Sequence, residues 1–289
     1  MLPATSRLIR SLVVLLTLLA ASSSQAGVEW NITANFKSPT TPLDITSSTD
    51  GKWTYVLAEG GKLYIFSDSG ALEETVSVDP AMDRISSSGL AAIGLPEKIY
   101  LASSKTKTVQ SITVEFPVAI NIQGAPFLGT ENAPVVMVLF SDFECPFCGQ
   151  VSPMLDEFLA KYPGKIKIVF KQFPLPMHKQ AQPAALAALA AHQQGKFWQY
   201  HDQLFANQKN LSDTKFPELA KQVGLDVERF NRDRKAPLLM QTMERDINDG
   251  RQAGVRGTPA LFINGRFVKD RNQENIRRMV DQELTKHSK

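Results

Sequence analysis

The chain contains only two cysteines, Cys145 and Cys148, and two residues separate them. They follow the apolar run Pro134–Phe140, which is typical of a strand buried on both faces. Pro146 suits the first turn of a helix, so a helix is expected to begin at the cysteines. Cys145 would then lie beside the free N–H groups and positive dipole end of that helix, which stabilise a thiolate. One thiolate can attack a disulfide, and a second thiol one turn later can resolve the mixed disulfide.

Two other uses of the cysteines compete with this interpretation. A structural zinc site needs about four ligands, and the chain offers only these two thiols and four histidines. A purely structural disulfide across so short a loop would add little stability. Redox chemistry is therefore the preferred interpretation, and we expect no metal and no cofactor.

The N-terminus has the pattern of a secretory signal peptide. Arg7 and Arg10 precede an apolar run at residues 12–20, and Ser24-Gln25-Ala26 supplies the small residues of a cleavage site. We therefore predict a signal peptide at residues 1–26; an uncleaved anchor is the alternative, although the run is short for a membrane span. Export would place the protein in the bacterial periplasm, an oxidising compartment in which the pair can persist as a disulfide.

Length and composition predict about two domains after residue 26. The hydrophobic fraction of 43% is enough for a buried core, and the formal net charge is only +3. No basic stripe is interleaved with aromatic residues, so nucleic acid is not an expected partner.

Residues 27–117 are predicted to form a small β-rich module. Two strands, Trp53–Leu57 and Lys62–Phe66, flank Glu59-Gly60-Gly61 and indicate a hairpin. Residues 98–102 and 109–114 repeat this pattern. The repeat indicates either two blade-like units of a β-propeller or one small antiparallel sheet. Two blades cannot close a propeller, so their edges would need cover from the other domain or from a second copy in a homodimer.

Residues 118–289 alternate between strand and helix signals. A strand is expected at Lys165–Phe170, followed by a mostly helical block at about 175–250, and a strand at Ala260–Ile263. Helical signals within the block run from Lys215 to Val223 and from Asp226 to about Ile247. The dipeptide Asn264-Gly265 then indicates a hairpin turn. Apolar residues at helical spacing indicate a final helix: Ile276, Met279, Val280 and Leu284.

Four ordered motifs resemble one known family. They are Phe140–Cys148 with Pro153, Phe173-Pro174-Leu175 with His178, Gly195-Lys196-Phe197-Trp198, and Gly254-Val255-Arg256-Gly257-Thr258-Pro259. In order and spacing the set resembles the DsbA-like branch of the thioredoxin superfamily. The resemblance implies an α/β thioredoxin fold with an inserted helical domain, here preceded by a small all-β domain.

The resemblance also implies roles for individual residues. Cys145 would be the exposed nucleophile and Cys148 the more buried resolving thiol. Thr258 and Pro259 would be joined by a cis peptide bond and would lie opposite the two cysteines. The Thr258 backbone would pair with an extended substrate.

The dipeptide Pro146-Phe147 would tune the redox pair. The classical DsbA dipeptide has a histidine where this chain has Phe147, which carries no charge and donates no hydrogen bond. Phe147 therefore weakens the case for a strong oxidant.

Two polar residues near the motif allow more than one interpretation. Asp142 could be a buried acid that handles the proton of Cys148, although a residue at a strand end is more often solvated or hydrogen-bonded. His178 could shape the substrate groove or relay protons, although a surface or capping histidine is the more common case.

Together these features predict a periplasmic thiol:disulfide oxidoreductase that exchanges disulfides with exported proteins. The alternatives are a disulfide isomerase or reductase acting as a dimer, and a redox-inert chaperone or binding module. Its membrane redox partner would be a quinone-linked oxidase or a donor of thiol reductant.

Overall fold

The structure is a computed structural model that describes residues 31–90 and 95–287. The predicted signal peptide at residues 1–26 lies outside the described residues. Within the described ranges, no helix is both long and apolar enough to cross a membrane.

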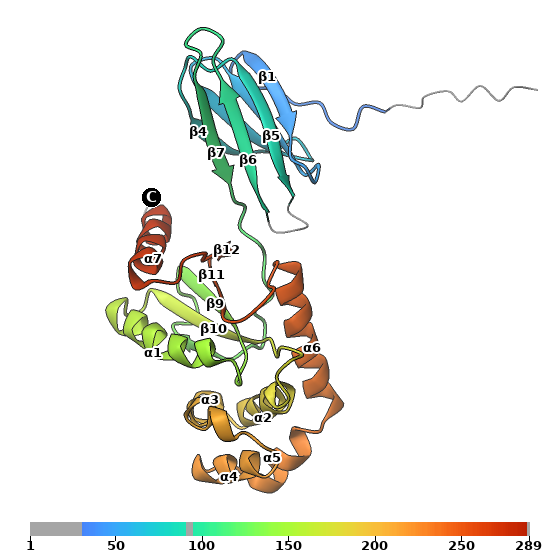
Figure 1. Ribbon diagram of the computed structural model, residues 1–289, viewed down its shortest axis with the longest axis vertical. Helices are drawn as coiled ribbons and strands as arrows, with labels where there is room; N and C mark the ends of the chain where they lie inside the picture. Colours follow the sequence, from blue (N-terminus) through green and yellow to red (C-terminus); the bar gives the residue numbers. More distant parts are fainter. Residues whose placement is uncertain (1–30, 91–94, 288–289) are drawn as a thin grey trace, which may run out of the picture.

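The first part of the chain forms two antiparallel meanders (Figure 1). One consists of β1 (Pro42–Ser47), β2 (Trp53–Ala58), β3 (Lys62–Ser67) and β4 (Leu72–Ser77); the other consists of β5 (Arg84–Leu90), β6 (Leu95–Ala102) and β7 (Val109–Val114). The hairpin predicted around Gly60 is confirmed as β2 and β3. The sequence did not predict β4, most of whose residues are exposed and offer no buried stripe.

The two meanders share one apolar core and meet along one edge. Tyr55, Leu57 and Ile65 of the first sheet belong to the same buried cluster as Ile99 and Leu101 of the second. Strands β1 and β5 lie side by side, where the backbone N–H of residue 85 donates to Asp44 Oδ2 at 2.9 Å. Strands β4 and β7 are left as the outer edges.

The second part of the chain is built around a five-stranded sheet with the order β12-β11-β9-β10-β8. The strands are β8 (Phe127–Gly129), β9 (Val135–Ser141), β10 (Ile166–Gln172), β11 (Ala260–Ile263) and β12 (Arg266–Phe267). The central pair β9 and β10 is parallel, whereas β8 and β11 pair antiparallel to it. Strand β9 is buried along nearly all its length, as its continuous apolar run predicts.

Helices cover both faces of this sheet, so alternate residues of β9 enter two different cores. Met137 and Leu139 pack with α1 (Pro146–Lys161) and α7 (Gln273–His287). Val138 and Phe140 belong to the cluster on the opposite face, against α6 (Pro237–Gln252). This is the thioredoxin fold, and the predicted fold class is confirmed.

A helical insertion separates β10 from β11. It consists of α2 (Ala181–His192), α3 (Phe197–Ala206), a 3₁₀ turn at Gln208–Asn210, α4 (Lys215–Gln222), α5 (Val227–Asp233) and α6. The helical signals from Asp226 to about Ile247 belong to two helices, because α5 ends at Asp233 and α6 begins at Pro237. Proline lacks the N–H that a continuous helix would need there, and it disfavours helical geometry at Ala236, which is extended.

The link between the two parts is short and is held at three points. The ring of Phe116 stacks on Trp53 of the β module, with centroids 3.9 Å apart. The backbone N–H of Val118 donates to the carbonyl of Gly265 at 2.9 Å. The buried Lys171 Nζ donates to the carbonyl of Asn121 at 2.9 Å. The same ammonium pairs with Asp246 and Asp249 of α6.

We expect Gly265→Ala to destabilise the protein more than Gly164→Ala does. Both glycines have positive φ, +77° and +73°, so each substitution places a side chain in the left-handed region at a cost of about 1–2 kcal/mol. A Cβ at Gly265 would lie 2.4 Å from the carbonyl oxygen of Val118, whereas one at Gly164 would have nothing within 4 Å. The excess should be about 1 kcal/mol or more in denaturant unfolding. Equal losses would mean that the linker does not hold this contact.

Candidate active site

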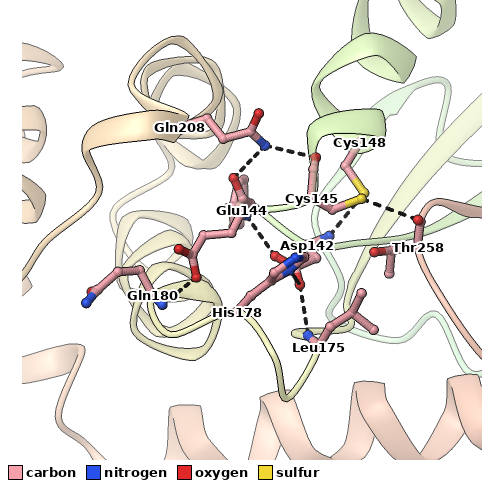
Figure 2. A network of polar contacts seen from close by, with 10 residues as sticks. Asp142, Glu144, Cys145, Cys148, Leu175, His178, Gln180, Gln208 and Thr258 are labelled. Carbon is pink, nitrogen blue, oxygen red and sulfur yellow. Dashed lines mark hydrogen bonds and ion pairs between the residues drawn. The ribbon is translucent and has the colours of Figure 1, made fainter.

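The two cysteines lie where the central sheet meets its first helix (Figure 2). Strand β9 ends at Ser141 and α1 begins at Pro146, so Cys145 is the N-cap residue, with an extended backbone. The backbone N–H of Cys148 donates to the Cys145 carbonyl at 3.0 Å. Both residues are free thiols in this structure.

Cys145 faces the loop that precedes β11. Its thiol donates to the carbonyl oxygen of Thr258 at 3.3 Å. The Thr258-Pro259 bond is cis, which confirms the geometry that the family resemblance implied. Cys145, Cys148, Thr258 and Pro259 therefore come together from distant parts of the chain, as expected.

The two thiols differ in burial, but less than expected. Cys145 is 4% exposed and Cys148 is 0% exposed, so the predicted order holds. The expectation that Cys145 is an exposed thiol is wrong, because the residue is almost covered at the junction of strand, helix and cis-proline loop. Phe147, in contrast, is 65% exposed beside the thiols.

Burial keeps Cys148 neutral. Desolvation raises the pKa of this thiol to about 12, because the charged form would lose its hydration. The hydroxyls of Ser141 and Thr258 and the backbone N–H of Asp142, 3.5 Å from Sγ, favour the thiolate, but they do not offset burial. Neither hydroxyl has another hydrogen-bond partner within the described chain.

Asp142 organises the loop that carries the cysteines. Its Oδ1 accepts from the backbone N–H of Glu144 at 2.7 Å, and its Oδ2 accepts from the backbone N–H of Leu175 at 2.8 Å. His178 Nδ1 lies 2.7 Å from the same Oδ2. Asp142 is 1% exposed, so the idea of a solvated carboxylate is wrong, whereas that of a hydrogen-bonded one is right.

His178 is paired with this carboxylate rather than being a free surface side chain, although its ring is still 24% exposed. The pair links the thiol loop to the segment after β10. The proton-relay role considered for these two residues stays a hypothesis.

Two further side chains fix the same loop, and neither role was predicted from the sequence. Gln208 Nε2, from the 3₁₀ turn of the helical insertion, donates to the carbonyls of Phe143 at 2.8 Å and Cys145 at 2.9 Å. The carboxylate of Glu144 accepts from the backbone N–H of Gln180 at the start of α2. Nothing in the local sequence marks Gln208, since its partners are more than sixty positions away. No group of three or more potential metal ligands occurs among the described residues.

Alkylation should separate the two thiols. Because the Cys148 pKa is about 12 in the folded state, iodoacetamide should modify Cys145 in Cys148→Ser and leave Cys148 nearly unmodified in Cys145→Ser, from about pH 7 to pH 9. Urea-unfolded Cys145→Ser is the control and should react normally. Equal rates for the two folded variants would contradict the assignment of roles.

The same pKa shift predicts how the reduced protein responds to alkali. The ordinary pKa of 9.0 applies to the unfolded chain, so that chain ionises Cys148 first as the pH rises. The reduced protein should therefore lose stability between about pH 9 and pH 12. Cys148→Ser should show a smaller loss over this range.

Asp142→Asn should destabilise the protein by roughly 1–3 kcal/mol, because an amide replaces a buried charged acceptor of three donors. The matched control is Asp202→Asn. That carboxylate also contacts a histidine, His201 Nδ1 at 2.8 Å, but its side chain is 73% exposed. We expect the control to stay within about 0.5 kcal/mol of wild type in denaturant unfolding. Similar losses in both variants would contradict an organising role for Asp142.

Comparison with known proteins places this geometry in a family. A family model described as thioredoxin matches residues 122–282. The solved structure of the thiol-disulfide exchange protein α-DsbA2 from Wolbachia pipientis is 28% identical, with a TM-score of 0.51, over 55% of this chain and 87% of that one. Oxidised BdbD from Bacillus subtilis is 24% identical, with a TM-score of 0.53, over 58% of this chain and 97% of that one, and shows the shared fold.

Curated relatives match the chain over a shorter span. A Na(+)/H(+) antiporter NhaA 3 from Salinispora tropica is 38% identical over 139 residues, which are 48% of this chain and 21% of that protein. The chain thus spans about a fifth of the length of such relatives. The family model, in contrast, covers more than half of this chain, including both cysteines and the cis-proline loop. The protein therefore belongs to the thioredoxin family and has its DsbA-like form.

Proposed function

We propose that this protein is a thiol:disulfide oxidoreductase that exchanges disulfides with exported proteins in the periplasm. The observation that carries the proposal is the pairing of Cys145 with the carbonyl of Thr258, while Cys148 lies fully buried one turn along α1. Cys145 can therefore react with a substrate, whereas Cys148 can react only with Cys145. The similarity to a thiol-disulfide exchange protein supports this reading.

The proposed reaction moves one disulfide between protein and substrate. In the oxidising direction a substrate thiolate attacks Cys145 Sγ, the Cys145–Cys148 bond breaks, and Cys148 leaves as a thiolate that takes up a proton. A second substrate thiolate then attacks the substrate sulfur of the mixed disulfide and releases Cys145. The substrate loses two electrons and the cysteine pair gains them. The reducing direction reverses these steps.

Export and recycling belong to the same proposal. The signal peptide predicted at residues 1–26 supports periplasmic localisation. A membrane partner would restore the pair after each cycle: a quinone-linked oxidase for an oxidant, or a thiol reductant donor for a reductase. Equilibration with glutathione buffers distinguishes these directions, since a potential near about −120 mV marks an oxidant and one near about −270 mV a reductant.

The activity test uses a reduced, unfolded protein that needs disulfides to regain activity. The oxidised full chain should accelerate recovery of that activity, and the double variant Cys145→Ser, Cys148→Ser should not. A redox-inert chaperone would keep its effect in the double variant, and that outcome would overturn the enzymatic proposal.

The isomerase alternative depends on a homodimer, which stays a prediction. Each of the outer strands β4 and β7 is paired on one side only among the described strands, and a symmetric partner is a common way to cover such edges. A dimer would hold two Cys145 sites around one substrate. Light scattering at micromolar concentrations should give twice the monomer mass, and a monomer throughout would remove the support for this alternative.

Phe147→His should make the protein more oxidising. An imidazole next to Cys145 can donate a hydrogen bond or carry positive charge, and either favours the thiolate of the reduced form. Phe147 is exposed, so the substitution should not disturb packing. The reduction potential should become less negative in glutathione buffers, while Phe147→Leu, an apolar control, should leave it nearly unchanged. Equal potentials for all three proteins would show that other groups set the potential.

A further inference from the structure

A cleft of about 760 Å³ lies between the β module and the cis-proline loop. We propose that it binds the substrate polypeptide next to the reacting cysteine, and that it favours segments carrying aspartate or glutamate. This inference rests on the proposed function, because its ligand is the thiol substrate itself. It assigns the β module a role as one wall of the substrate site.

The cleft and the thiol site share the cis-proline loop. Thr258 and Pro259 line it, and the carbonyl of Thr258 is the group that contacts Cys145. A polypeptide whose cysteine reaches Cys145 must pass this loop, and the cleft receives the chain on one side of it. Its volume lies within the range of about 300–1,000 Å³ that is typical of ligand sites.

The β module provides one wall of the cleft. That wall contains Glu97 from β6, together with Glu115 and Phe116 from the segment after β7. The module cannot be treated as a loosely tethered part, because Phe116 stacks on Trp53 and Val118 pairs with Gly265. Lys269 also pairs with Glu115 across the cleft.

The opposite wall is basic. Four basic side chains line the cleft against two acidic ones: Arg256, Arg266, Lys269 and Arg271 against Glu97 and Glu115. Lys269 offsets Glu115, and Thr49 donates to one carboxylate oxygen of Glu97 at 3.1 Å. Arg266 lies 3.5 Å from Glu283, outside the lining. With Glu283 counted, these four basic side chains stand against three acidic ones; Arg271 is exposed, so an acidic segment would meet an excess of one positive charge.

The apolar part of the cleft suits a polypeptide rather than a small anion. Phe116 lies on the module side, and Phe267 lies on the sheet side beside the buried Phe262. Phe267 is exposed and belongs to β12, which is the edge strand of the sheet. An extended segment can therefore place apolar side chains on the rings and carboxylates on the basic rim.

The test measures how fast the oxidised full chain reacts with three synthetic single-cysteine peptides. The peptides are identical except for three consecutive residues beside the cysteine, which are aspartate, asparagine or lysine, and both sides of the cysteine are tried. Each rate constant is divided by that of the same peptide with the uncharged disulfide of 2-mercaptoethanol, which removes the effect of the flanking charge on thiol reactivity without adding a charge on the reference. On one side, the aspartate peptide should exceed the lysine peptide by at least about threefold at low salt, and the ratio should fall as salt rises.

Three variants locate the effect. Arg271→Glu should bring the ratio close to one, whereas Arg277→Glu, an exposed arginine of α7 outside the cleft, should leave it near the wild-type value. Glu97→Gln removes a negative charge from the module wall and keeps an oxygen that can accept from Thr49, so it should raise the ratio.

Each outcome decides one point. A wild-type ratio near one on both sides, or a ratio that Arg271→Glu does not lower, would overturn the cleft proposal while exchange itself continues. An unchanged ratio in Glu97→Gln would overturn the role of the module as a wall. If no peptide reacts faster with the protein than with the disulfide of 2-mercaptoethanol, the proposed function fails, and the cleft proposal fails with it.

Discussion

The buried carboxylate of Asp142 is the constraint around which the candidate site is arranged. A charge that has lost its water must find donors inside the protein, and here they come from Glu144, Leu175 and His178. These groups lie on the cysteine loop and on the segment after β10, so satisfying one carboxylate brings two strand ends together. The N-cap position of Cys145 and the burial of Cys148 both depend on that loop keeping its course.

Much of the fold and of the candidate site could be predicted from short-range features of the sequence. Three signals act over only a few residues and can be recognised in a single sequence. They are the continuous apolar run of β9, the proline after Cys145 and the glycine turn between β2 and β3. The cis bond at Pro259 came from the family resemblance, because an isolated Thr-Pro pair is trans by default. The break between α5 and α6 is also marked locally, by Pro237.

The features that were not predicted depend on contacts between distant segments. The low exposure of Cys145, the partners of Asp142 and the two hydrogen bonds of Gln208 exist only after the helical insertion and the cis-proline loop have folded over the thiol loop. Strand β4 was missed for a different reason. Most of its residues are exposed although it pairs with β3, so its sequence lacks the alternation of apolar and polar residues that indicates a strand. How the module faces the thioredoxin fold is likewise set by three contacts around a short linker.

The hydrogen bonds of Gln208 have a consequence for protein engineering. One amide group from the helical insertion donates to two carbonyls of the cysteine loop. Grafting the Cys-Pro-Phe-Cys segment onto a thioredoxin scaffold without this insertion would leave both carbonyls without that donor. The transferable unit is therefore the segment together with the 3₁₀ turn at Gln208–Asn210, although more than fifty residues separate them in the chain.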